Sequence, residues 1–402
     1  MSNPPTAPTH APVPVSGPKT ASPPPYRLRL PGPAPVPDRV KEAMSAPVVN
    51  HRGPEFRSTL AQAQEKMQQL LGTREPVLFF ASSGTGMMEA SLVNTIDAGD
   101  RVLVVVNGQF GERFSSIAAA LGAQVDTLEV PWGEAVDPDA VRDCVTKIDY
   151  RAVVVIHNES STGIVNPMKD IGDALRDQAT LLIADSVSGL GGIEMKQDEW
   201  GIDIVVSASQ KCLMCPPGAG LVSLSAHARS LVEREGGKHC FYWDFRKALA
   251  SAAKHETPFT PPTALITGLT ESLQMIGEEG IPQVLRRHTR LASALRAGCV
   301  ALGLSCFGQH DALSSTVVVM NVPDGLNGAD IVRLLYERHR MVIAGARNKL
   351  AGKIIRLGVM GHIHEDDILR DLAQLEDVLR LLGWSCGTGA GVKAAEAVLA
   401  SP

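Results

Sequence analysis

Two ionisable residues stand at the ends of apolar runs, where their side chains could take part in chemistry. Lys211 lies in "SASQKCLMCPPGAG", after a short apolar run, with no acid between residues 210 and 220. Such a lysine is either a solvated surface residue or a nucleophilic amine whose pKa is lowered by desolvation. Asp185 follows the apolar run 181–184, which is typical of a buried strand. A buried carboxylate requires a cation or strong donors, and a direct ion pair with Lys211 is the simplest arrangement.

Small, polar and aromatic residues follow three other apolar runs. The run 77–80 leads into "ASSGTGMMEA", a turn that opens a helix. The free N–H groups of such a turn suit a phosphate, and a tight strand-to-helix turn explains the pattern equally well. "NGQFGER" follows the run 102–106 and presents Phe110, as either a core side chain or a stacking surface. "HNESSTG" follows the run 153–156.

Apolar runs and helical stretches alternate between about residues 56 and 225. Continuous apolar strands separated by helices predict an α/β domain with a mostly parallel sheet covered on both faces. The carboxyl ends of parallel strands meet at one edge of such a sheet, so a ligand is expected there. Lys211 and Asp185 would then face one cleft.

The rest of the chain predicts a second unit and two tails. Residues 1–25 are rich in Pro, Ala, Ser and Thr, so we expect a disordered tail. An N-terminal arm and the large domain would occupy residues 26–280, and a smaller α+β domain residues 281–385. Residues 386–402 are expected to be a loose tail.

Composition limits the partners of this chain of 402 residues. A net charge of -5 gives no basic surface for nucleic acid or an anionic membrane, so we expect small-molecule partners. No apolar run is long enough to cross a bilayer, and the seven scattered cysteines favour a reducing, cytoplasmic location. Cys212 and Cys215 form one C-x-x-C, which indicates buried loop thiols rather than a redox or metal site. No metal site is predicted.

Pyridoxal 5'-phosphate requires the residue types found at these strand ends. Its aldehyde needs an amine, its pyridine nitrogen a carboxylate, its ring an aromatic face and its phosphate a cradle. The sequence offers one of each, and we therefore expect this cofactor.

Taken together, the motifs resemble the class V aminotransferases, which are fold type I pyridoxal phosphate enzymes. The resemblance is to the group of alanine:glyoxylate and serine:glyoxylate (or pyruvate) aminotransferases, and it extends over residues 26–384. It rests on eight motifs in the expected order: "HRGPEF", "SSGTGMMEASLVN", "NGQFGER", "HNESSTG", "ADSVSGLGG", "SQKCLMCPPG", "TPFTPPTALITGL" and "RLGVMG".

The resemblance implies a role for each matching residue. Lys211 corresponds to the lysine that forms the Schiff base, the internal aldimine, and Asp185 to the partner of the pyridine nitrogen. Phe110 corresponds to the stacking aromatic and Ser160 to the partner of the phenolic oxygen. Arg356 corresponds to the arginine that binds the substrate carboxylate. The phosphate would be held by Ser83, Gly84, Thr85 and Gln210, and across a homodimer interface by Thr257 and Thr260.

The implied activity is transfer of an amino group from a small L-amino acid, of the alanine or serine type, to glyoxylate or pyruvate by a ping-pong mechanism. Alternatives on the same scaffold are pyridoxamine:pyruvate transamination, 2-aminoethylphosphonate transamination and a cysteine desulfurase-like lyase. Gln210 stands where desulfurases usually have histidine, and "SSGTG" lacks the acid of pyridoxamine-specific relatives. Arg347 is a second cation near Arg356, either reading a distal acid of a longer substrate or solvated in a loop.

Overall fold

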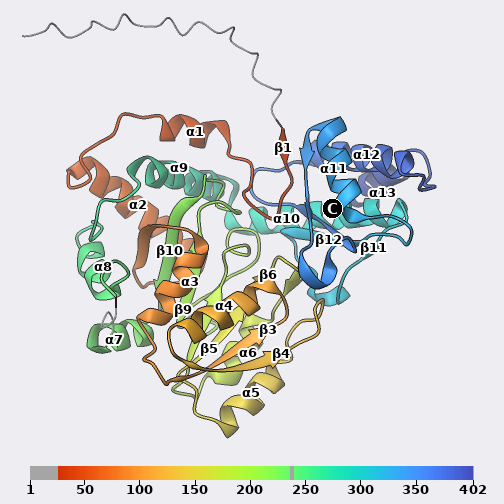
Figure 1. Ribbon diagram of the computed structural model, residues 1–402. Coiled ribbons are helices and arrows are strands. Elements are labelled where there is room, and N and C mark those ends of the chain that lie inside the picture. The colour runs from red at the N-terminus through yellow and green to blue at the C-terminus, as the bar shows by residue number, and fades with distance from the viewer. Residues whose placement is uncertain (1–25, 236–239, 402) are drawn as a thin grey trace, which may run out of the picture.

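The computed structural model describes residues 26–235 and 240–401. The predicted Pro-rich tail, residues 1–25, lies outside the described residues. At the centre lies a seven-stranded sheet in the order β2-β10-β9-β8-β5-β3-β4 (Figure 1). β10 is antiparallel to both neighbours, whereas the other neighbouring pairs are parallel. The predicted α/β fold with a mostly parallel sheet is confirmed. The strands are β2 (Val77–Ser82), β3 (Arg101–Val106), β4 (Gln124–Glu129), β5 (Ala152–Ile156), β8 (Leu181–Asp185), β9 (Ile204–Ala208) and β10 (Gly218–Leu224).

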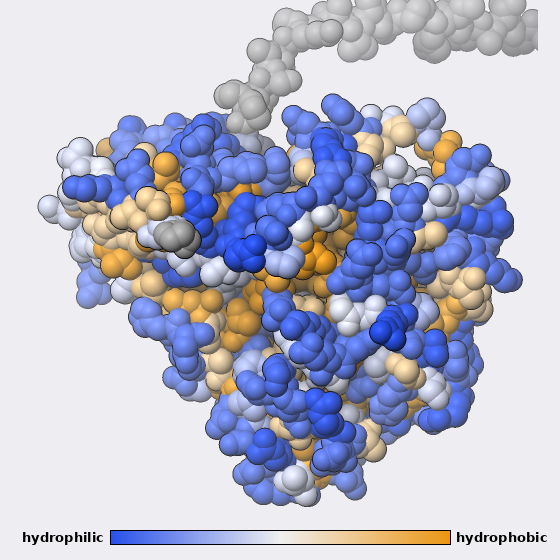
Figure 2. Space-filling model, turned by 180° about the vertical axis from the view of Figure 1, so that it is seen from behind, coloured by the Kyte–Doolittle hydropathy of each residue, from blue (hydrophilic) through white to orange (hydrophobic). Residues whose placement is uncertain are grey.

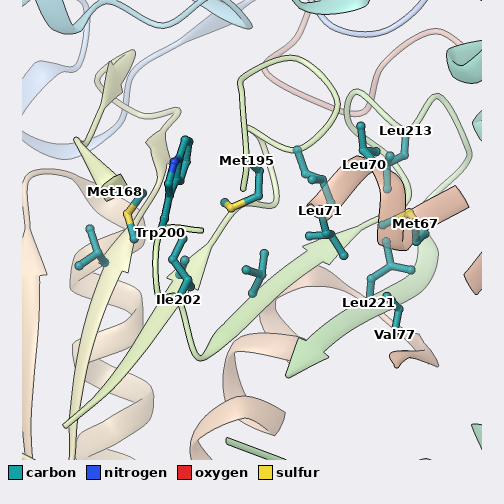
Figure 3. Packing of buried hydrophobic residues seen from close by; sticks show 14 of the residues in the cluster. Met67, Leu70, Leu71, Val77, Met168, Met195, Trp200, Ile202, Leu213 and Leu221 are labelled. Carbon is teal, nitrogen blue, oxygen red and sulfur yellow. The ribbon is translucent and has the colours of Figure 1, made fainter. Parts of the chain in front are cut away.

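Helices cover both faces of this sheet because its central strands are apolar on both sides. In β5, Val153 and Val155 join one hydrophobic cluster while Val154 and Ile156 join the other, as alternate strand residues must. Figure 3 shows part of the first cluster, where Met67 and its α2 neighbours pack near β10. The helices of this part are α1 (Asp38–Met44), α2 (Pro54–Leu71), α3 (Gly84–Val93), α4 (Gln109–Ala120), α5 (Pro138–Lys147), α6 (Met168–Leu175), α7 (Ala226–Glu235), α8 (Phe245–Ala252) and α9 (Thr263–Glu279).

The C-terminal part forms a smaller antiparallel sheet, in the order β11-β12-β15-β14, with its own hydrophobic cluster. It appears in blue on the right of Figure 1. We propose that this part is a separate domain beginning at residue 281. Its strands and helices are α10 (Ile281–Ala301), β11 (Ser305–Cys306), β12 (Val317–Asn321), α11 (Gly328–His339), β14 (Ala344–Gly345), β15 (Ile354–Gly358), α12 (Glu365–Leu381) and α13 (Ala390–Leu399).

The loose tail expected from residue 386 is wrong, because α13 is a helix packed against α10. Ala395 is fully buried and Leu399 nearly so. The small residues that make this segment look weak in sequence allow the two backbones to approach closely. A Cβ added to Gly298 would lie 2.8 Å from the carbonyl oxygen of Gly391.

The surface seen from behind is mostly hydrophilic, with hydrophobic side chains gathered toward the middle (Figure 2). Among the described residues, no helix is long and apolar enough to span a bilayer.

The N-terminal arm connects the small sheet to the edge of the large one. β1 (Arg27–Leu28) pairs with β13 (Met341–Val342), and the chain then runs to Ala34, whose amide donates 2.8 Å to the Gln210 carbonyl. Asp371, only 1% exposed, anchors the arm through ion pairs to Arg27 and Arg29 at 2.7 and 2.6 Å. The arm is therefore fixed where it crosses the carboxyl edge of the sheet.

Replacing Asp371 with alanine is expected to lower the free energy of unfolding by about 2 kcal/mol. The Arg29 side chain, 4% exposed, would lose its fully buried partner and keep only the partly exposed Asp367, at 2.6 Å. Asp377 pairs with Arg338 on the surface, and its replacement should cost less than about 1 kcal/mol. Urea denaturation of both variants measures the difference. Equal losses in the free energy of unfolding would show that the ion pairs of Asp371 stabilise the protein no more than a surface pair does.

Candidate active site

A cavity of about 220 Å³ opens at the carboxyl edge of the large sheet. Eight predicted site residues line it together: Ser83, Gly84, Thr85, Phe110, Ser160, Asp185, Gln210 and Lys211. They come from strand ends and turns scattered over more than a hundred positions of sequence, and parallel strand topology brings them to one place. Other lining residues include Arg113, Asn158 and Ser188, which sequence reasoning missed.

Lys211 follows β9 and is partly buried beneath the N-terminal arm. Its Nζ donates a hydrogen bond to the carbonyl oxygen of Pro31. Gly32 has φ +110°, which residues with a side chain rarely adopt, and a Cβ there would meet the end of the Lys211 side chain. Burial lowers the pKa of Lys211 to about 8, although the Asp185 charge opposes this shift. The amine is thus partly unprotonated near neutral pH.

Asp185 ends β8 and is 4% exposed. Its Oδ1 accepts a hydrogen bond of 2.8 Å from the Val187 amide. Burial raises the pKa of Asp185 to about 6, the Glu159 charge raises it further, and the Val187 hydrogen bond and the charges of Lys211 and Arg113 oppose the rise. In the described chain no ion pair joins Asp185 directly to Lys211, so the simplest sequence-based arrangement is wrong. The carboxylate lines the cavity.

The N-terminus of α3 forms a cradle of hydrogen-bond donors at one end of the cavity. The Ser83 hydroxyl accepts from the Gly86 amide at 3.2 Å, which leaves the amides of Gly84 and Thr85 available. Gln210 Oε1 is buried without a hydrogen-bond partner in the described chain, so its amide group is free to turn toward a ligand. These groups fit the phosphate of pyridoxal 5'-phosphate.

Phe110 is positioned by Glu159, a carboxylate with no measurable exposure that sequence reasoning did not single out. Glu159 Oε2 accepts from the amides of Phe110 and Gly111 at 2.9 and 3.2 Å, and so caps the start of α4. Its Oε1 accepts from the Ser161 amide at 3.0 Å. Burial raises the pKa of Glu159, and these hydrogen bonds oppose the rise. The sequence signal was an acid within the otherwise uncharged "HNESSTG".

Replacing Glu159 with glutamine is expected to reduce the free energy of unfolding by about 2 kcal/mol, because both carboxylate oxygens accept from backbone amides. The amide NH2 of glutamine would face either the donors of α4 or that of Ser161. The loosened Phe110 ring should also weaken the near-UV circular dichroism of bound cofactor. Glu129, exposed at the end of β4, offers a glutamine control. If Glu159→Gln melts and absorbs like the wild type, the capping role is wrong.

Three predicted residues lie outside the cavity wall. Arg356 stands behind Ser160: its Nη1 donates 3.1 Å to the Ser160 carbonyl, and its Nη2 donates 2.7 Å to the Gly345 carbonyl. No carboxylate pairs with Arg356 in the described ranges. Thr257 is buried, and its hydroxyl donates to the Phe259 carbonyl, whereas Thr260 is exposed. The structure does not bring either threonine to the cavity of its own chain.

The thiols beside Lys211 are buried, as the sequence predicted. Cys212 and Cys215 are at most 1% exposed, and burial raises the pKa of both to about 12. Such thiols remain protonated and poorly reactive.

The lysine, the carboxylate and the helix N-terminus around one cavity at strand ends define an α/β enzyme of the pyridoxal phosphate-dependent class. The chain belongs to the class-V aminotransferase family, whose model matches residues 32–369. The chain is therefore an aminotransferase, and members of this family depend on pyridoxal 5'-phosphate.

Its relatives match almost end to end. An uncharacterized aminotransferase of Methanocaldococcus jannaschii is 38% identical over 92% of this chain and 97% of its own length. The small subunit of a soluble hydrogenase of Synechococcus is 38% identical over 93% and 98%. An L-aspartate–glyoxylate aminotransferase of Paracoccus denitrificans is 35% identical over 91% and 94%.

Two solved structures share the architecture. The ureidoglycine–glyoxylate aminotransferase of Bacillus subtilis superposes with a TM-score of 0.90 at 30% identity, over 95% of this chain and 100% of that one. The alanine–glyoxylate aminotransferase of Nostoc has a TM-score of 0.87 at 31% identity, over 90% and 97%.

Proposed function

We propose that this aminotransferase moves an amino group from a small L-amino acid of the alanine or serine type to glyoxylate or pyruvate, in two half-reactions that share one site. The observation that carries the proposal is that Lys211 and Asp185 line one cavity with the α3 N-terminus. The glyoxylate named as acceptor in several relatives supports the choice of oxo acid.

When bound, pyridoxal 5'-phosphate supplies an aldehyde for amines and a ring that accepts electrons. Lys211 Nζ, with its lowered pKa, provides the nucleophilic amine and then moves a proton as a base. Asp185 keeps a proton on the ring nitrogen. Phe110 offers a stacking face, and Ser160 a hydrogen-bond donor for the phenolic oxygen. Ser83, Gly84, Thr85 and Gln210 would hold its phosphate.

Substrate size follows from the space and charge around Ser160. The cavity is small, and the Arg356 guanidinium donates a hydrogen bond to the carbonyl of Ser160, which lines it. An arginine without an acid partner is suited to a substrate carboxylate. Arg347 is exposed, so we assign it no part in binding a distal acid.

The alternative reactions find less support. Among the described residues, no acid lines the cradle, which disfavours pyridoxamine as a substrate because pyridoxamine lacks the phosphate that these donors fit. A desulfurase requires a reactive thiol, whereas Cys212 and Cys215 are buried and protonated. 2-Aminoethylphosphonate has no carboxylate for Arg356.

A half-reaction screen tests the proposal. The purified enzyme is mixed with each amino acid in turn, with 2-aminoethylphosphonate and with pyridoxamine, and conversion of the visible absorption band is recorded. Alanine or serine should convert it fastest, and glyoxylate or pyruvate should restore it. A band that responds only to an acidic amino acid or to the phosphonate would replace the proposed donor.

We also propose a homodimer with shared sites. Ser83 and Thr85 are exposed, so the cradle stands open to a second subunit. Phe241, 72% exposed, lies 5.5 Å from the Phe259 ring in an aromatic surface cluster next to Thr260. Thr260 would reach the phosphate of the other subunit, with Thr257 holding the loop. Light scattering should give twice the chain mass, and a fully active monomer would refute the arrangement.

A cytoplasmic location is proposed from the seven cysteines, all within the described residues and all unpaired. Cell fractionation with recovery of the activity outside the soluble fraction would contradict it.

A further inference from the structure

Arg113 is the third charged side chain of the cavity, besides Lys211 and Asp185. It lies on α4, about one helical turn after Phe110. Its Nη1 donates a hydrogen bond of 3.1 Å to Thr85 Oγ1, and its guanidinium carbon lies 4.6 Å from the centre of the Phe110 ring. Arg113 therefore connects the cradle to the aromatic wall of the cavity.

Among the described residues, some N–H donors of the Arg113 guanidinium have no acceptor. Within residues 26–235 and 240–401, no carboxylate lies within ion-pair distance of it, and its Nε and Nη2 contact no acceptor. Its neighbour Glu112 instead pairs with Lys349 at 3.7 Å. A partly buried arginine with a free fork of donors and no acid is suited to an anionic group.

The charges around the cradle also favour an anionic group next to Arg113. Ser83, Gly84, Thr85 and Gln210 offer only neutral donors and the partial charge of a helix N-terminus. A full positive charge nearby would stabilise a phosphate dianion there further. Lys211 is required at the aldehyde and Asp185 at the ring nitrogen, so Arg113 is the remaining charged group of the cavity wall.

We propose that Arg113 is a phosphate-binding residue, which closes the cradle from the α4 side and selects the phosphorylated form of the cofactor. The proposal rests on the proposed placement of the cofactor and extends it to the last residue of "NGQFGER", to which the resemblance assigns no role. Thr85 holds the guanidinium in place, and the Phe110 ring supports its flat face.

The test compares two ligands that differ only in the phosphate. Apoprotein is titrated with pyridoxal 5'-phosphate and with pyridoxal, and binding is followed by absorbance and by quenching of protein fluorescence. Arg113→Ala should bind pyridoxal 5'-phosphate about 10- to 100-fold more weakly and pyridoxal as the wild type does, since one charge-assisted contact is lost. Arg113→Lys should recover part of the loss. Arg142→Ala, which removes an exposed arginine of α5, is the control for net charge.

Two results would overturn the inference. If Arg113→Ala binds both ligands as the wild type does, the phosphate does not contact Arg113. If it weakens both ligands equally, Arg113 acts by supporting the Phe110 ring, and Phe110→Leu should reproduce the pattern. Wild-type apoprotein that binds neither ligand would remove the proposed cofactor placement as well, so the two failures are distinguishable.

Discussion

Replacement of Lys211 by alanine is expected to lower turnover by at least about 10⁴-fold, because the chain would lose its nucleophile and its proton carrier in one side chain. The structure places Lys211 in the cavity with Asp185 and gives its amine a pKa of about 8. Borohydride reduction of the wild type followed by peptide mass spectrometry should find one cofactor joined to the peptide that carries Lys211. The Lys211→Ala protein should carry no such label.

Two control variants separate chemistry from structure. Lys211→Arg keeps the positive charge and removes the nucleophile, so its turnover should fall as far as that of Lys211→Ala. Lys196→Ala removes a surface lysine that pairs with Glu194 and Glu199, and should leave turnover unchanged. A label on another lysine in the wild type would assign the chemistry elsewhere.

The sequence was sufficient for features that depend on local pattern. The buried strands β5, β8 and β9 are short continuous apolar runs, and each predicted run is a strand in the structure. Asp185 could be singled out because it ends such a run, and Lys211 because it is the one cation in the uncharged loop after another. Parallel topology then makes their proximity a consequence of the fold class.

Features that depend on distant segments could not be predicted. Glu159 acts on the amide of Phe110, 49 positions earlier, and Arg29 meets Asp371 across 342 positions. Neither partner carries a local signal of the other. Nothing in the sequence around Arg113 indicates that it meets Thr85, which comes from another strand end. The segment of α13 was expected to be a tail because its small residues pack well only against the facing helix.

Replacing Asp185 with asparagine should lower turnover by at least about 10²-fold and yet make the apoprotein more stable at alkaline pH. The loss follows because an amide cannot stabilise the positive ring nitrogen that the carboxylate faces. The gain follows from burial. The pKa of Asp185 rises from 3.8 to about 6 on folding, because the buried carboxylate is poorly solvated when charged. Above that pKa the folded protein must hold the charge, which destabilises it relative to the unfolded chain, and asparagine removes this cost.

The sign of this effect fixes the pH window. Below about pH 3.8 the carboxyl group is neutral in both states, and the substitution should change stability little. Between there and about pH 6 the folded state binds more protons, so the wild type loses stability as the pH rises. Above that range the full difference of about 3 kcal/mol remains. Urea denaturation of both apoproteins at pH 5 and pH 8 measures it, with the exposed Asp139→Asn as control. Equal stabilities at pH 8 would show that Asp185 carries no desolvation cost, and undiminished turnover would show that it does not serve the ring nitrogen.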